Sequence, residues 1–125
     1  MPHLLLIFLG GGTGAMCRFA LNNMVGRALG TAFPYGTLTI NLLGAFCIGI
    51  VVELMALKLS APTQIRFLLV TGFLGGFTTF SAFSLESALM LERGDIRELV
   101  CYVAASVIGT IGLVLLGTWL VRHAT

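Results

Sequence analysis

Apolar residues dominate the chain in four long stretches, separated by short polar or turn-forming segments. The stretches cover residues 4–29, 35–59, 63–91 and 99–121. Each is long enough to cross the hydrocarbon core of a bilayer, which takes about 20 residues in a helix. The pattern predicts an all-α membrane protein with four transmembrane helices, because only helices or closed barrels satisfy every backbone polar group in lipid.

The boundaries between the stretches carry turn and charge signals. "GTAFPYG", "KLSAPTQIR" and "LERGDIRE" separate the four stretches in turn. Ser60 or Thr63 is expected to cap the third helix. Gly94 is the expected C-cap of that helix, and Asp95 the expected N-cap of the fourth. Residues 1–125 are therefore predicted to form a single transmembrane domain.

The composition agrees with a membrane protein that has lipid around it. Hydrophobic residues make up 58% of the chain and charged residues 10%, whereas soluble domains average about 25% charged residues. The formal net charge is +2, with no basic stripe of the kind that a nucleic-acid partner requires. The sequence therefore predicts a membrane-lipid environment and no nucleic-acid partner.

The positive charges of the loops, which normally set membrane orientation, are nearly balanced here. With four spans, one side carries Lys58, Arg66 and Arg122, and the other carries Arg27, Arg93 and Arg97, with Arg18 leaning toward it. This leaves two alternatives: weak sidedness, or dual topology in which copies insert both ways and pair antiparallel. Four short spans are too few to enclose a passage, so we expect an oligomer, most simply a two-fold dimer.

Polar residues inside the spans need either a partner or a role, because they are costly at membrane depth. Asn41 lies within "TLTINLLG", and its amide either bonds a neighbouring helix or faces a permeating anion. Glu53 is near the end of its span and is expected to snorkel. Arg18 is expected near a membrane–water boundary, where it would draw anions into a vestibule.

The fourth stretch carries hydroxyl groups at a helical spacing. Tyr102, Ser106 and Thr110 recur every four residues, which places them on one helix face. We expect this face to form a polar seam against a partner helix or a wet passage. Glycines at positions 12, 44 and 109 are expected to be helix-packing sites, since small residues let helices approach closely.

The third stretch is an unusual transmembrane segment, reading "GFLGGFTTFSAFSLES" from Gly72. The adjacent glycines Gly75 and Gly76 each weaken a helix by about 1 kcal/mol, and the following hydroxyl groups can bond to freed backbone groups. The segment therefore predicts a third helix broken near its middle. Such breaks in transporters aim carbonyl groups at cations and helix N-termini at anions.

Phenylalanines in the same stretch recur at near-helical spacing, at positions 73, 77, 80 and 83. Ordinary packing in lipid explains them. A second interpretation is that their positive ring edges face a small anion that is losing its water.

Two of these motifs, "GTLTINLLGAF" and "TGFLGGFTTFSAFSLES", together with "GGGTGAMCRF" near the start, carry a family resemblance. The chain resembles the Fluc-type (CrcB-like) bacterial fluoride channels over essentially its whole length. The resemblance implies an antiparallel, dual-topology homodimer with two pores, spanning the bacterial cytoplasmic (inner) membrane several times. It implies passive, highly selective fluoride export and no enzymatic activity.

The resemblance also implies roles for particular residues. It implies a structural sodium ion at the dimer centre, held by the main-chain carbonyl groups of Gly75 and Thr78. It places Arg18 at a vestibule. The residues that it places along the fluoride pathway are Asn41, Phe80, Phe83, Ser81, Thr37, Glu86, Tyr102, Ser106 and Thr110.

Two rival functions come from other classes of protein. A small multidrug-resistance-type, proton-coupled exporter would also be a four-span, dual-topology dimer, but it needs a glutamate in the first span, and this chain has none there. A structural or assembly subunit would use the polar seam only for packing. Flux measurements in liposomes separate the three functions.

Overall fold

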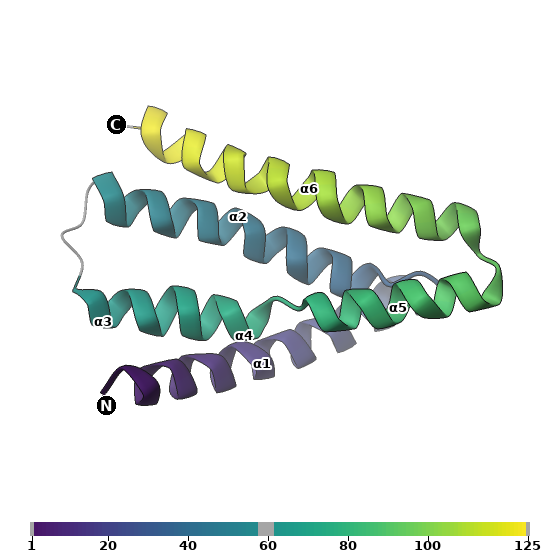
Figure 1. Cartoon of the computed structure of the whole chain (residues 1–125), viewed down its shortest axis with the longest axis horizontal. Helices are drawn as coiled ribbons and strands as arrows, with labels where there is room; N and C mark the ends of the chain where they lie inside the picture. Colours follow the sequence, from purple (N-terminus) through teal and green to yellow (C-terminus); the bar gives the residue numbers. More distant parts are fainter. Residues whose placement is uncertain (1, 58–61, 125) are drawn as a thin grey trace.

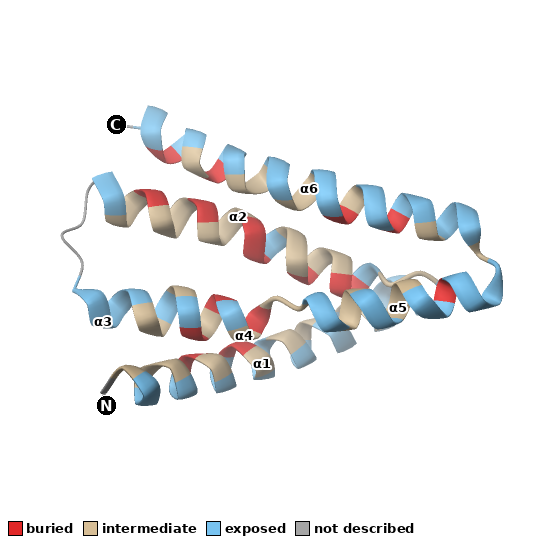
Figure 2. Cartoon of the chain, viewed as in Figure 1, coloured by how far each residue is buried: buried red, intermediate tan, exposed pale blue. Residues whose placement is uncertain are grey.

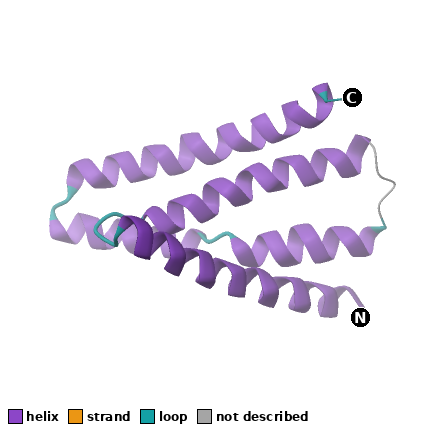
Figure 3. Cartoon of the chain, turned by 180° about the vertical axis from the view of Figure 1, so that it is seen from behind, coloured by secondary structure: helices purple, strands orange, loops and turns teal. Residues whose placement is uncertain are grey.

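The computed structural model describes residues 2–57 and 62–124, and this part of the chain is helical apart from short connections (Figure 1). No strand occurs among the described residues (Figure 3). The prediction of an all-α chain is therefore confirmed. The helices, of which η1 is a π-helix, follow in this order: α1 Pro2–Leu29, α2 Tyr35–Leu57, α3 Thr63–Arg66, η1 Phe67–Leu74, α4 Gly75–Phe77, α5 Phe80–Arg93 and α6 Ile96–His123.

Four helical stretches are long and apolar enough to cross a membrane. They are His3–Leu29, Tyr35–Leu57, Thr63–Arg93 and Ile96–His123. They coincide with the predicted stretches except at the ends, and residues 58–60, which include Lys58 and the proposed cap Ser60, lie outside the described residues. The chain is thus a multi-pass membrane protein.

The outward faces of the helices are strongly apolar, whereas the buried residues lie on the faces turned toward other helices (Figure 2). Phe8 on α1 is 75% exposed and Ile108 on α6 is 72% exposed. Burying apolar surface is worth about 25 cal/mol per Å², so these faces are suited to lipid or to a second chain rather than to water.

Close helix approach divides the bundle into two pairs. α2 packs along α6, and α1 packs along η1 and α4. A methyl group at Gly49 or Gly117 would collide with the backbone of the opposite helix of the first pair. A methyl group at Gly10 or Gly14 would collide with the backbone of η1 or α4 in the second pair. Small residues thus allow the backbones to touch, as in other membrane helix pairs.

Two of the three glycines predicted as packing sites have close neighbours. A methyl group at Gly44 would collide with the side chain of Thr78, and one at Gly109 would collide with Leu42. Gly12, by contrast, has open space beside it. Its prediction as a packing site is therefore wrong within a single chain, because the nearby contact surface of α1 is supplied by Gly10 and Gly14.

The start of α1, the end of α2, the start of α3 and the end of α6 lie at one end of the bundle, and the α1–α2 and α5–α6 connections lie at the opposite end (Figure 1). Gly94 ends α5 in the left-handed conformation, with φ 80°, as predicted. Asp95 occupies the predicted N-cap position of α6, but its side chain makes no capping hydrogen bond and instead pairs with Arg93. The residue that precedes α3 is Pro62, with Thr63 as the first helical residue. The prediction that Thr63 caps this helix is therefore wrong, since a cap lies before the first helical turn.

Glu53 is buried rather than snorkelling toward the membrane surface. Its carboxylate accepts a hydrogen bond from Nε of Arg122 at 2.9 Å, which joins α2 to the last turn of α6. The predicted orientation is wrong because the partner helix brings a cation to the carboxylate, so the side chain does not have to reach water.

Candidate functional site

The third span is interrupted between α4 and α5. Thr78 (φ −82°, ψ 157°) and Thr79 (φ −149°, ψ 121°) are both extended. The hydroxyl oxygen of Thr79 accepts from the N–H of Ala82 at 3.1 Å and so caps α5. A single threonine therefore ends the interruption and starts the next helix.

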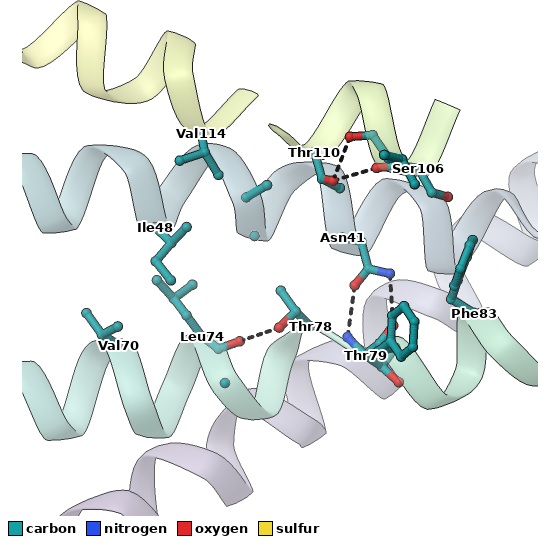
Figure 4. Close-up of a pocket in the computed structure, with 15 residues that line it drawn as sticks. Asn41, Ile48, Val70, Leu74, Thr78, Thr79, Phe83, Ser106, Thr110 and Val114 are labelled. Carbon is teal, nitrogen blue, oxygen red and sulfur yellow. Dashed lines mark hydrogen bonds between the residues drawn. The ribbon is translucent and has the colours of Figure 1, made fainter. Parts of the chain in front are cut away.

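Asn41 on α2 holds this interruption from across the bundle (Figure 4). Its Oδ1 accepts from the N–H of Thr79 at 2.8 Å, and its Nδ2 donates to the carbonyl oxygen of Thr79 at 2.9 Å. The backbone N–H fixes the orientation of the amide, because only the oxygen of the amide can accept from it. One hydrogen on Nδ2 remains for another acceptor.

The interruption releases two carbonyl groups from their helical donors. In an unbroken α-helix, the carbonyl of Gly75 would accept from the N–H of Thr79, and that of Thr78 from the N–H of Ala82. Here the Thr79 N–H donates to Asn41 and the Ala82 N–H donates to the Thr79 hydroxyl. The carbonyl oxygens of Gly75 and Thr78 are therefore free of these helical bonds and available to coordinate a cation.

Arg18 on α1 lies beside the same interruption. Its Nε donates to the carbonyl oxygen of Gly76 at 3.1 Å, and the contact is partly buried. α1 packs against α4 and so brings the guanidinium to a carbonyl at a helix end, and the expected position of Arg18 near a membrane–water boundary stays a prediction. Its role at a vestibule stays a prediction.

A pocket of about 380 Å³ lies beside the interruption, between α2, α6 and the third span (Figure 4). Its remaining lining is mainly apolar and includes Ile48, Val70 and Leu74. The structure thus brings together residues from three spans that are far apart in the sequence. The predicted site residues that line the pocket are Asn41, Gly75, Thr78, Phe80, Phe83, Ser106 and Thr110.

The hydroxyl face of α6 turns toward the interior of the bundle. Tyr102 is fully buried and Ser106 is 8% exposed. Thr110 donates its hydroxyl to the carbonyl of Ser106, one turn earlier. Among the described residues, the buried Oγ of Ser106 has no hydrogen-bond partner. A buried hydroxyl without a partner costs about 1–3 kcal/mol, so this group is poised to bond something that enters the pocket.

A second group of predicted residues gathers around Tyr102. The Tyr102 hydroxyl donates to Oε1 of Glu86 at 3.1 Å, and the buried Thr37 hydroxyl interacts with it as well. The ring of Tyr102 contacts that of Phe83 with centroids 5.0 Å apart. Because Phe83 also lines the pocket, Tyr102 joins the Glu86 group to the pocket.

Ser81 lies outside the pocket lining. It is exposed at the start of α5, and its hydroxyl lies 3.3 Å from that of Thr79. The phenylalanines that line the pocket differ in exposure: Phe80 is 78% exposed and Phe83 is half-buried. Their ring centroids are 5.6 Å apart.

Sequence reasoning missed several contacts. Thr79 as the cap of α5 had a local signal, a threonine directly before a helical segment. Two other contacts had no local signal. The rings of Phe33 and Tyr102 pack in a T-shaped arrangement, with centroids 5.6 Å apart and an interplanar angle of 83°. Arg122 pairs with Glu53. The partners lie 69 residues apart in each case, and nothing local marks such pairs.

Comparison with known proteins gives one family. The family model described as "CrcB-like protein, Camphor Resistance (CrcB)" matches residues 5–118. The "Fluoride-specific ion channel FluC" of Chelativorans sp. (strain BNC1) is 52% identical over 122 residues, which cover 98% of each chain. The protein of the same name from Granulibacter bethesdensis is 50% identical over 122 residues, which cover 98% of this chain and 96% of that protein.

Proposed function

The chain belongs to the CrcB-like protein family, and we propose that it is a selective channel through which fluoride leaves the cell passively. The observation that carries the proposal is its near full-length identity to relatives that are named fluoride-specific ion channels. A channel of this kind is a transport protein and not an enzyme. The residues beside the helix interruption supply a chemistry that suits this function.

The pocket offers weak contacts of several kinds to a small anion. The remaining Nδ2 hydrogen of Asn41 and the unpartnered hydroxyl of Ser106 are donors. The rings of Phe80 and Phe83 present positive edges. Fluoride is strongly hydrated, so it would exchange water for these contacts in steps, each weak enough to allow the ion to leave. Thr37, Ser81, Glu86, Tyr102 and Thr110 would extend this pathway.

A structural sodium ion fits the carbonyl groups of the interruption. The carbonyl oxygens of Gly75 and Thr78 have lost their helical donors. Hard cations prefer oxygen ligands, and unwound carbonyls at a helix break coordinate sodium in other membrane proteins. In the proposal, two copies each supply these two carbonyl groups, and a sodium ion bound there would join the subunits.

Two antiparallel copies would complete the site. Gly75 and Phe80 line the pocket yet are exposed in the single chain, so part of the pocket wall is open to a partner. The nearly equal positive charge at the two ends of the bundle suits insertion in both orientations. The proposed assembly is a dual-topology homodimer in the bacterial cytoplasmic membrane.

Fluoride efflux from liposomes that contain the purified protein tests this function. A channel should release fluoride, measured with a fluoride electrode, without a proton gradient. Proton-driven uptake of an organic cation would instead indicate a small multidrug-resistance-type exporter. Absence of both fluxes would indicate an assembly subunit.

A further inference from the structure

A second, more polar pocket lies at the end of the bundle that carries the α1–α2 connection. Its volume is about 470 Å³. The last turns of α1, the connection, the first turn of α2 and Glu86 of α5 form its walls. The polar and charged side chains that line it are Asn22, Asn23, Arg27, Thr31 and Glu86.

The shape of this pocket depends on a close contact between α1 and α2. Gly36, in the first turn of α2, is buried, and a methyl group there would collide with the side-chain amide of Asn22. Glycine at this position therefore leaves room for the amide. On the other side, Gly30 ends α1 with a φ of 84° and turns the chain into the connection.

The side chain of Tyr102 contacts residues of this polar pocket and a residue of the pocket beside the interruption. Glu86 accepts from the Tyr102 hydroxyl, and the ring of Phe33 packs against the ring of Tyr102. Tyr102 in turn contacts Phe83, which lines the other pocket. The buried side chain of Tyr102 therefore lies between residues of the two pockets.

The charges at this end of the bundle do not otherwise attract an anion. Arg93 is engaged with Asp95 at 3.0 Å. The segment from position 86 to position 98 holds four acidic residues, Glu86, Glu92, Asp95 and Glu98, against two basic ones, Arg93 and Arg97. Among the residues that line the polar pocket, Arg27 is the cation and Glu86 is the acid.

We propose that the polar pocket is a mouth of the fluoride pathway, where Arg27 and the amides of Asn22 and Asn23 hold a hydrated anion. This inference rests on the proposed function. A carboxylate at Glu86 opposes the approach of an anion, and the positive charge of Arg27 in the same pocket offsets it. Asparagine amides donate hydrogen bonds without adding charge, so they hold the anion without trapping it.

A collecting site has a kinetic signature that a structural role lacks. A charge in a cleft raises the local concentration of the opposite ion, and salt screens the effect. The charge of Arg27 should therefore matter when fluoride is dilute and ionic strength is low. It should matter little when fluoride saturates the pathway, because passage beside the helix interruption then limits the flux.

The proposal is tested by measuring fluoride flux as a function of fluoride concentration, at low and at high ionic strength. An impermeant salt sets the ionic strength. We expect Arg27→Gln to lower the flux about fivefold at low fluoride and low ionic strength, as one charge at contact distance in water implies. The maximal flux should be retained. Arg27→Lys, which keeps the charge, should retain most of the flux at low fluoride.

Arg97→Gln is the matched control, because Arg97 is an exposed arginine in the first turn of α6, at the same end of the bundle and outside the pocket. It should leave the flux curve unchanged. Identical flux curves for the wild type and Arg27→Gln would overturn the proposed role of the polar pocket. So would an effect of Arg97→Gln as large as that of Arg27→Gln. Neither result would contradict the proposed channel function. If Arg27→Gln does not fold, two other results would overturn the proposed role of the polar pocket. One is loss of flux at low fluoride in a folded Arg27→Lys variant. The other is wild-type flux that does not depend on ionic strength. Absence of fluoride flux in the wild type would instead refute the proposed function.

Discussion

The side-chain amide of Asn41 and the backbone of Thr79 exchange two hydrogen bonds, 2.8 Å and 2.9 Å long, across the interruption of the third span. The bond to Oδ1 replaces the helical bond that the Thr79 N–H would otherwise donate to the carbonyl of Gly75. It fixes the position of the interruption relative to α2, and it orients the amide that lines the pocket.

Replacing Asn41 with leucine should destabilise the protein as well as block fluoride. The backbone N–H of Thr79 would lose its partner, which costs about 1–3 kcal/mol in a buried position, and the Thr79 carbonyl would lose its bond from the amide. Thermal unfolding in detergent should show a lower Tm, and liposome flux should be lost. Ser84→Ala, which removes an exposed hydroxyl from α5, is the control and should alter neither property.

Asn41→Asp separates the two roles of the amide. The carboxylate can still accept from the Thr79 N–H, but it cannot donate to the Thr79 carbonyl, and its charge repels an anion. We expect folded protein with little fluoride flux. Wild-type flux in this variant would mean that the amide does not face the ion.

Ser106→Ala should lower fluoride flux without lowering stability. The serine hydroxyl is buried and, in the described part of the chain, has no partner, so its removal deletes an unsatisfied group rather than a bond. Flux should fall severalfold while Tm stays the same or rises. Thr118→Ala removes a hydroxyl elsewhere on α6, one that bonds its own helix, and is the matched control. A Tm decrease with unchanged flux would assign Ser106 to structure.

Phe80→Ile and Phe83→Ile should each abolish fluoride flux while the protein keeps the oligomeric state of the wild type. Isoleucine keeps an apolar side chain at the position but removes the ring edge. Phe8→Ile, at an exposed position on α1, should keep its flux. Flux and size-exclusion profiles provide the readouts, and normal flux through both pocket variants would reject the contribution of the ring edges.

Glu53→Gln should lower the Tm but leave the fluoride flux near its wild-type value. Glu53 is buried and joined to Arg122, and neither residue lines the two pockets described above. The loss in Tm should shrink when salt is added, since the arginine side of the pair is exposed and screened. A change in flux in proportion to the change in Tm would contradict this prediction and would indicate that the Glu53–Arg122 pair influences the fluoride pathway.

Hydropathy and turn residues were enough to predict the four spans and the cap at Gly94, because both depend on local sequence. The weakness of the third helix at Gly75 and Gly76 was also visible. The two extended residues, Thr78 and Thr79, follow Gly76 after one intervening residue. The partners could not be predicted. Asn41 and Thr79 are 38 residues apart, and the inward turn of Glu53 depends on Arg122, 69 residues away. Such contacts depend on how helices pack, which no local pattern records.

The most direct test of the channel is whether fluoride release from liposomes depends on charge compensation. In vesicles loaded with potassium fluoride and chloride, passive release of an anion builds up a voltage that stops further release. Valinomycin, which lets potassium follow, should therefore start a rapid fluoride efflux with little chloride efflux. No fluoride release above protein-free vesicles after valinomycin, or equal release of chloride, would contradict a selective fluoride channel.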